Sequence, residues 1–342
     1  MEIFSTYMTF DILRMSGDDS GENVPLFRDP DDADDTQVVI LDDRDDGPYF
    51  DLWTLFARRK PLRFNELLSD RSSLSNLEDV DLIIPLAGSS NPFWKDDDQA
   101  QQCNNAPTLN VFSSRVLKFY GIEDPPTRKN DEPIVVTFVK RRDTRRLRNQ
   151  DHLIASLQRR NSHIRVQMVD FAAIPFSEQV RVARGTDVLV GVHGAGLTQS
   201  LFMRQGAGAV VEIQPEELDH NGFRNVAGMR GLGYYRAHAS TISPEMWTES
   251  EGPKNVREGT MGGTTRSRSD DNESMVEDPG RRRSEARPRN EAESGEIVQR
   301  EIQGRDGWHW SDIDMEESRF LETVEAAIKF MYNKGPWKFD IS

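Results

Sequence analysis

Short apolar segments alternate with amphipathic segments between residues 36 and 238. Most of the apolar segments are near-continuous runs of β-branched and aliphatic residues, which is typical of strands buried on both faces of a parallel sheet. The segments between them repeat apolar residues with helical spacing. Strands that alternate with helices in this way predict an α/β fold with doubly wound parallel sheets. The pattern predicts strands at 36–41, 81–86, 134–139, 164–169, 187–192 and 209–213, and helices at 109–121, 150–160 and 175–185.

Two interruptions of this pattern divide the chain. Pro125, Pro126 and Pro133 lie among charged residues and indicate a linker between two α/β units. Residues 244–307 are rich in Glu, Arg, Ser and Gly, so they cannot bury enough apolar surface to offset chain entropy, and we expect a disordered insertion. Apolar residues at helical spacing return within 315–337. The predicted organisation is therefore an N-terminal unit (1–130), a second α/β unit (131–243), the insertion (244–307), and a C-terminal helix (308–342) packing back on the fold.

Composition and charge exclude several classes of function. The chain has 342 residues, with 43 basic and 58 acidic side chains and a net charge of -15, which disfavours general binding to nucleic acid. No apolar run approaches the ~18 residues of a membrane span, and the first residues lack the basic start and apolar core of a signal peptide. The single cysteine, Cys103, excludes an intrachain disulfide and a cysteine-based zinc site. No HExxH motif is present, so no metal site is predicted.

The clearest local motif is GVHGAGLTQSLF at residues 191–202, which follows a predicted strand and opens a predicted helix. Glycines at such a junction let backbone amides approach a ligand, and the positive end of the helix dipole attracts phosphate oxygens. His193 lies at the carboxyl end of the strand, where it could bind a phosphate or transfer a proton. The spacing alone leaves open a turn whose glycines serve only close packing. The dinucleotide fingerprint is absent, because Gln199 stands where its third glycine belongs. A Walker A loop is absent too, because the chain contains no Gly-Lys-Ser or Gly-Lys-Thr sequence.

A second motif is the strongly basic segment KRRDTRRLRN at residues 140–149, which follows the strand predicted at 134–139. Arginine side chains bind phosphate oxygens through two parallel hydrogen bonds, so Arg141, Arg145 and Arg146 are candidate ligands of a diphosphate. A merely solvated loop is the alternative. Because this segment and the glycine motif both leave the carboxyl ends of parallel strands, we expect them to face one cleft.

Glu212 ends the strand predicted at 209–213, at the same edge of the sheet. There it could accept hydrogen bonds from ribose hydroxyls, or serve only as a surface cap. Both interpretations stay open.

Residues 136–235 resemble the catalytic core of glycosyltransferase family 61, most closely its members that attach O-linked N-acetylglucosamine to EGF domains. The resemblance rests on RRDTRRLRN, VDF, FSEQVRVARGTDVLVGVHGAGLTQSLFM, VVEI and LGYY, in this order. Four further similar segments lie outside this core: GPYFDLW, PLAGSSNPFW, NVFSSRVLKFYG and KGPWKF. The resemblance therefore covers most of the chain that is expected to be ordered.

The resemblance implies a fold, a reaction and a compartment. The fold would be GT-B-like, with two Rossmann-type doubly wound units. The reaction would be inverting transfer of GlcNAc from UDP-GlcNAc to a Ser or Thr hydroxyl of an EGF-like extracellular domain. It would use no tightly bound cofactor, and whether it requires manganese stays open. The compartment would be the lumen of the endoplasmic reticulum. Two alternatives stay open: an inactive relative that only binds a nucleotide or a partner, and a transferase using UDP-xylose or a polysaccharide acceptor.

The resemblance also implies site residues. Asp11 matches an aspartate of the family's first unit and is a candidate base for the acceptor hydroxyl, although Tyr7 and Met8 stand where the family has a histidine. His193 is the second candidate catalytic residue. The implied donor-binding residues are Arg141, Arg145, Asn149, Gln179, His193, Gly194, Ala195, Gly196, Leu197, Thr198 and Glu212.

Overall fold

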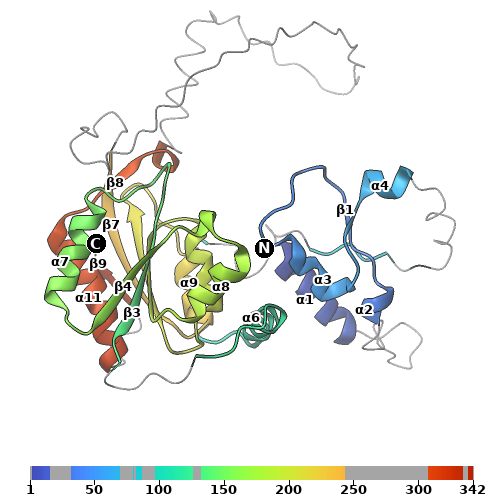
Figure 1. The fold of residues 1–342 in the computed structure, drawn as a ribbon, viewed down its shortest axis with the longest axis horizontal. Coiled ribbons are helices and arrows are strands. Elements are labelled where there is room, and N and C mark those ends of the chain that lie inside the picture. The colour runs from blue at the N-terminus through green and yellow to red at the C-terminus, as the bar shows by residue number, and fades with distance from the viewer. Residues whose placement is uncertain are drawn as a thin grey trace, which may run out of the picture.

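The computed structural model describes residues 2–15, 32–69, 80, 82–86, 97–125, 132–242, 307–333 and 338–341. Figure 1 shows a layered α/β part and, beside it, a smaller and mainly helical part built from the first residues of the chain. The predicted insertion at 244–307 lies almost entirely outside the described residues.

A seven-stranded sheet forms the centre of the α/β part. Its strands follow the order β4-β3-β5-β6-β7-β8, and β9 also pairs with β7. The pairings are parallel except that between β7 and β8, which is antiparallel. The strands are β3 (Ile134–Val139), β4 (Ile164–Val169), β5 (Val188–Val192), β6 (Ala209–Pro215), β7 (Gly233–Ile242), β8 (Asp312–Asp314) and β9 (Lys338–Ile341).

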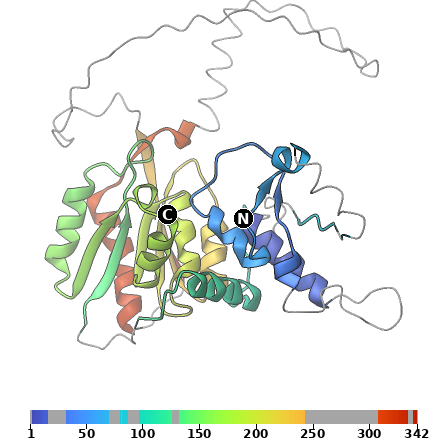
Figure 2. The same cartoon turned by 45° about the vertical axis from the view of Figure 1, so that its right-hand side comes forward.

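Helices cover both faces of this sheet (Figures 1 and 2). Every residue of β5 and β6 is buried, which explains why these strands read as unbroken apolar runs. One layer consists of α7 (Gln150–Arg160) and α11 (Glu317–Asn333). The other consists of α8 (Phe176–Arg184), α9 (Gly222–Met229), and the 3₁₀ helices η3 (Phe171–Ala173) and η4 (Ala195–Phe202). The doubly wound α/β fold predicted for this part is therefore confirmed.

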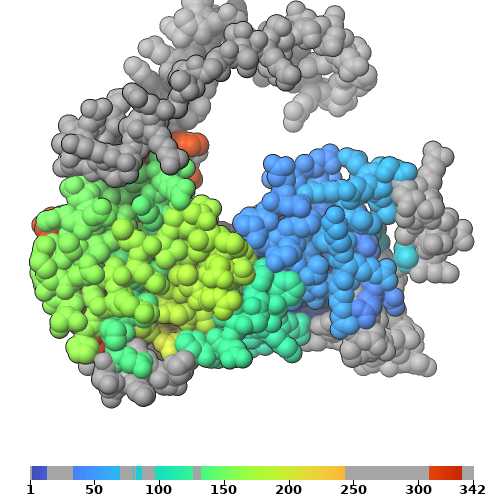
Figure 3. Space-filling view, viewed as in Figure 1, coloured from blue at the N-terminus to red at the C-terminus, as the bar shows by residue number. Residues whose placement is uncertain are grey.

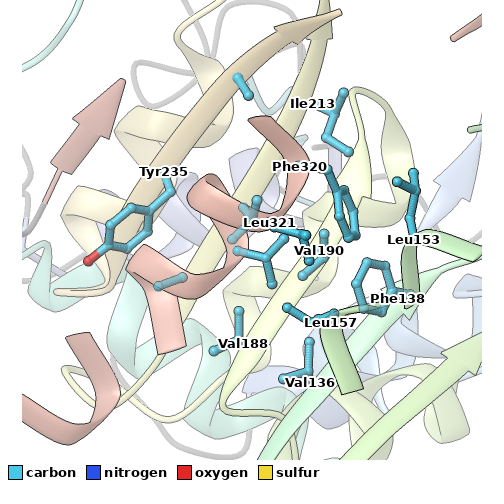
Figure 4. Close-up of a cluster of buried hydrophobic side chains, with 14 of the residues drawn as sticks. Val136, Phe138, Leu153, Leu157, Val188, Val190, Ile213, Tyr235, Phe320 and Leu321 are labelled. Atoms are coloured by element: carbon cyan, nitrogen blue, oxygen red, sulfur yellow. The ribbon is translucent and has the colours of Figure 1, made fainter. Parts of the chain in front are cut away.

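The main core lies between the sheet and the layer of α7 and α11 (Figure 4). Phe138 of β3 stacks on Phe320 of α11, with 5.9 Å between the ring centroids. Leu157 of α7 and Val190 of β5 complete this cluster and are fully buried. Each such side chain contributes roughly 1.5–3 kcal/mol of burial free energy, so this cluster holds the strand ends in place.

The strand order identifies the edge at which a ligand is expected. From β3, the chain adds β4 on one side and then β5, β6 and β7 on the other. The connections that leave β3 and β5 therefore run in opposite directions along the sheet, and the position between these two strands is its switch point. In open α/β sheets, ligands bind at the switch point, outside the carboxyl ends of the strands. The basic segment after β3 and the glycine motif after β5 both begin there.

The N-terminal part differs from the prediction. Its described residues form helices and one two-stranded parallel sheet, so the second Rossmann-type unit of a GT-B fold is not seen among them. The strand predicted at 36–41 shortens to two residues, and residues 82–86 form no strand. Leu82 and Ile84 are 85% and 81% exposed, because no described layer covers them. The elements are α1 (Glu2–Met15), α2 (Asp32–Asp35), β1 (Val39–Ile40), η1 (Phe50–Trp53), α3 (Thr54–Ala57), β2 (Leu62–Arg63) and α4 (Phe64–Ser69).

Helix α6 (Pro107–Phe119) joins the two parts. Phe112 of α6 packs in one cluster with Phe4 of α1 and Phe202 of η4. Ser113 donates a hydrogen bond to the carbonyl of Leu201 at 2.7 Å. Figure 3 shows the N-terminal residues resting on α6 and on the α/β part, with a hollow above the contact. No helix in the described ranges is both long and apolar enough to cross a membrane.

Candidate functional site

A cleft of about 560 Å³ opens at the switch point of the sheet. One wall is formed by residues 140–144 of the arginine loop, which is defined as residues 140–149, and the floor is the start of η4. The opposite wall is apolar and contains Phe4 of α1 and Tyr49 beside η1. The predicted meeting of the basic segment with the glycine motif is therefore observed, because both lie at the carboxyl ends of adjacent strands.

Two arginines of this loop converge on one glycine. A side-chain carbon added at Gly194 would lie 2.9 Å from Nη1 of Arg145 and 3.3 Å from Nη1 of Arg141. Arg145 also donates a hydrogen bond to the carbonyl of His193 at 3.0 Å. Both guanidinium groups are thus held over the backbone of the glycine turn, defined as residues 193–197.

The two guanidinium groups carry uncompensated positive charge. Neither forms an ion pair in the described part of the chain, and the Nε atom of Arg145 is buried without a hydrogen-bond acceptor there. Burial, reinforced by the charge of Arg141, lowers the pKa of Arg145 to about 10. Burial also lowers the pKa of Arg141, although Asp143 and Asp170 act in the opposite direction. A bound anion would relieve this unfavourable arrangement.

The other arginines of the loop are already paired. Arg142 forms an ion pair with Asp170. Arg146 donates to both carboxylate oxygens of Asp312, at distances of 2.6 to 3.2 Å. Arg146 was predicted to bind a diphosphate together with Arg141 and Arg145, but Asp312, which no sequence motif connects to this loop, occupies its guanidinium group.

The glycine turn brings backbone amides to the cleft. Gly194 has φ 147° and ψ 178°, a conformation essentially confined to glycine. A side-chain carbon at Gly196 would lie 2.5 Å from Cγ1 of Val139. The following helix is the 3₁₀ helix η4, and its first amides have no partner within the helix. Ala195, Gly196 and Thr198 line the cleft, whereas Leu197 is fully buried and faces the core.

Replacing Gly194 by alanine should lower both the free energy of unfolding and the affinity for a diphosphate. The backbone strain is worth about 1–3 kcal/mol, and the new methyl group would meet both guanidinium groups. Gly206→Ala is a matched control, because Gly206 also has a positive φ, 67°, but open space around it. Chemical denaturation and titration with UDP measure the two quantities. A Gly194→Ala variant that binds UDP like the Gly206→Ala variant would contradict this expectation.

His193 is anchored by a buried carboxylate. Its Nδ1 atom lies 2.5 Å from Oε1 of Glu212, and the hydroxyl of Tyr234 donates to Oε2 of the same carboxylate at 2.5 Å. Glu212 is fully buried in the interior of β6. The predicted position of Glu212 on the rim, facing ribose hydroxyls, is therefore wrong: both of its oxygens are occupied inside the protein. An ionised Glu212 only accepts hydrogen bonds, and beside it Nδ1 of His193 is the donor and Nε2 is the ring atom left for other partners.

Aromatic rings surround His193. The rings of His220, Phe223 and Trp308 lie 4.6, 5.4 and 5.4 Å from its ring centroid. Trp308 also lies 5.7 Å from the guanidinium carbon of Arg145. Sequence reasoning missed Tyr234 and Trp308, because neither belongs to a motif at the switch point and both reach it only through folding.

The predicted donor-binding residues do not all line the cleft. Arg145, His193 and Gly194 lie outside the lining, next to Arg141. Asn149 is exposed and does not line the cleft. It precedes α7 with a left-handed φ of 54° and makes no side-chain cap, so its residue type fits the backbone rather than a ligand. Gln179 lines the cleft, but its amide donates to the carbonyls of Phe171 and Ile174 and accepts from Gln199. Gln179 therefore supports the cleft wall from inside.

Asp11 lies away from the cleft. Ile3 and Phe4 of α1 line the cleft, whereas Asp11 follows them by about two helical turns, roughly 10 Å along the axis. The acidic residues among the described residues of the lining are Asp143 and Asp170. No group of three or more His, Cys, Asp or Glu side chains suited to a metal ion occurs in the described ranges.

Comparison with known proteins relates this chain to glycosyltransferases. Residues 90–210 match the Glycosyltransferase 61 family. EGF domain-specific O-linked N-acetylglucosamine transferases are similar: that of Drosophila melanogaster is 29% identical over 203 residues, covering 58% of this chain and 37% of the relative. Those of Mus musculus and Canis lupus familiaris are 32% and 34% identical over 134 and 135 residues, covering 39% of this chain and 25% of each relative. The chain thus matches between a quarter and little more than a third of the length of these relatives, and the matches support a glycosyltransferase.

Proposed function

We propose that this chain, whose residues 90–210 match glycosyltransferase family 61, binds UDP-GlcNAc and transfers GlcNAc with inversion to Ser or Thr hydroxyls of extracellular, EGF-like protein domains. The names of the relatives described above specify O-linked transfer of N-acetylglucosamine to EGF domains. The lumen of the endoplasmic reticulum, where such acceptors fold, is the compartment that we propose for the reaction. No tightly bound cofactor is part of the proposal.

One observation carries the donor part of the proposal. Arg141 and Arg145 converge on Gly194 without a carboxylate partner among the described residues. A nucleoside diphosphate supplies the missing negative charge and enough oxygens for two guanidinium groups and nearby backbone amides. The volume of about 560 Å³ is in the range of small-molecule sites and leaves room for a nucleoside and a sugar.

The same groups would assist the departure of the diphosphate. Negative charge grows on the leaving oxygens as the bond to the sugar breaks, and positive groups fixed beforehand stabilise it without reorganisation. A doubly protonated His193 would donate a further hydrogen bond through Nε2, because its Nδ1 already contacts Glu212. The acceptor hydroxyl would then attack from the opposite face of the sugar, which inverts the anomeric carbon.

A second function, nucleotide binding without transfer, is favoured by the position of Asp11. The acceptor hydroxyl needs a base, and Asp11 does not belong to the lining of the cleft. Of the two carboxylates in the described lining, Asp170 is already paired with Arg142. An inactive relative would retain the arginines and the glycine turn and would bind UDP without turnover.

Calorimetric titration with UDP, UDP-GlcNAc and UDP-xylose, each with and without manganese, tests the donor. We expect saturable binding with preference for UDP-GlcNAc. Preference for UDP-xylose would instead favour the alternative transferase that uses UDP-xylose as its donor. Incubation with UDP-GlcNAc and a folded EGF-like domain, followed by mass spectrometry, then separates transfer from binding alone. A folded chain that binds none of the three ligands would overturn the donor assignment.

A further inference from the structure

A short segment from the far side of the sheet holds the arginine loop in place. Residues 308–314, here called the strap, contain the end of η7 (Gly307–His309) and the strand β8. The strap pairs with the last residues of β7 and runs alongside residues 145–148. It is remote in sequence from both motifs of the cleft.

Backbone hydrogen bonds join the strap to the arginine loop. The amide of Arg145 donates to the carbonyl of Ser311 at 3.0 Å, and the amide of Arg148 donates to the carbonyl of Ile313 at 2.8 Å. The amide of Ile313 donates in return to the carbonyl of Arg146 at 2.9 Å. These bonds hold a stretch that begins at Arg145 with a left-handed φ of 56°, a conformation that a non-glycine residue rarely adopts without support.

An ion pair with a buried carboxylate reinforces these bonds. The side chain of Asp312 is 2% exposed, and it accepts from the backbone amide of Arg146 at 2.8 Å as well as from its guanidinium group. Asp312 thus binds the residue that immediately follows Arg145. Trp308 at the other end of the strap lies against both Arg145 and His193.

We infer that Asp312 is a positioning residue, which through Arg146 and the strap sets the guanidinium group of Arg145 in the geometry required for a diphosphate. The inference rests on the proposed binding of a nucleoside diphosphate. Its physical reason is the repulsion between Arg141 and Arg145. Two like charges held together without a counter-ion move apart unless the backbone that carries them is fixed. A loop fixed before binding then loses less conformational freedom when the ligand arrives.

Asp312→Asn tests this role, and Asp314→Asn is the matched control. Asp314 lies on the same strand and pairs with Arg148 at 3.5 Å, but its side chain is 42% exposed. If Asp312→Asn fails to fold, the double variant Arg146→Gln/Asp312→Asn takes its place. It removes both charges of the ion pair together, so neither charge is left without its partner. Affinities for UDP, inorganic pyrophosphate and uridine, the last by competition with UDP, are measured for each folded variant.

We expect the affinities for UDP and pyrophosphate to fall about tenfold in Asp312→Asn or in the double variant, and that for uridine to stay unchanged. Asp314→Asn should bind all three ligands like the wild type. Wild-type affinity for UDP in the folded variants would overturn the inference alone. An equal loss for uridine and UDP would overturn it too, because it would indicate general damage to the cleft. Absence of UDP binding by the wild-type chain would overturn the proposed function, and this inference with it.

Discussion

Replacing Arg141 by alanine should lower the affinity for UDP by about a hundredfold while leaving the free energy of unfolding nearly unchanged. Two hydrogen bonds from a charged guanidinium group contribute roughly 1.5 kcal/mol each or more, about 3 kcal/mol together, which corresponds to a factor of about 100 in the dissociation constant. Among the described residues, the side chain of Arg141 makes one long hydrogen bond, 3.4 Å, to the carbonyl of Thr144. Its removal also relieves repulsion with Arg145, so the folded state loses little.

Arg142→Ala separates a specific contact from general electrostatics. Arg142 is the next residue of the arginine loop, its side chain is 63% exposed, and it is paired with Asp170. Loss of this exposed charge should change the affinity for UDP less than about fivefold, since exposed charges contribute only about 0–1 kcal/mol. Titration calorimetry at one ionic strength measures both variants. Equal losses in Arg141→Ala and Arg142→Ala would show that the loop attracts the nucleotide only through its net charge.

The α/β part could be predicted from the sequence because the patterns that specify its strands and helices lie within short segments of the chain. Strands buried on both faces read as β-branched runs, and amphipathic helices repeat at their own period. The predicted strands at 134–139, 164–169, 187–192 and 209–213 are all observed, within two residues at their ends. Parallel strands also place their carboxyl ends at one edge, so the approach of the arginine loop to the glycine turn followed from topology.

Other parts of the site depend on contacts between residues distant in sequence. Asp312 is 166 residues from Arg146, and only the folded sheet brings β8 beside the arginine loop. The orientation of Glu212 was mispredicted because the residue sits in the interior of β6, whose end the pattern placed two residues too early. In the N-terminal part, the apolar segment at 82–86 satisfies the pattern of a strand, yet no described neighbour pairs with it.

The buried carboxylate beside His193 decides which ring nitrogen of the imidazole is left for other partners. When Glu212 accepts from Nδ1, a neutral His193 presents a lone pair at Nε2 and a cationic His193 presents a donor there. In Glu212→Gln, one amide must face both Tyr234 and His193. If its oxygen accepts from the tyrosine, its NH₂ group faces Nδ1, and the ring proton must move to Nε2.

Glu212→Gln should therefore lower turnover by about 10–100-fold, because a buried hydrogen bond to a charged group, worth roughly 1.5–3 kcal/mol, is lost and the proton of the ring moves to the other nitrogen. Affinity for UDP should fall less, since Arg141 and Arg145 remain. Tyr234→Phe is the control: it removes the second hydrogen bond of Glu212 without touching that to His193, and it should cost about 1 kcal/mol of stability with turnover within a few-fold of wild type. Steady-state transfer rates between about pH 5 and pH 9 distinguish the two variants, because histidine titrates in this range. Turnover in Glu212→Gln that equals the wild type across the range would show that His193 neither carries charge nor moves a proton in the reaction.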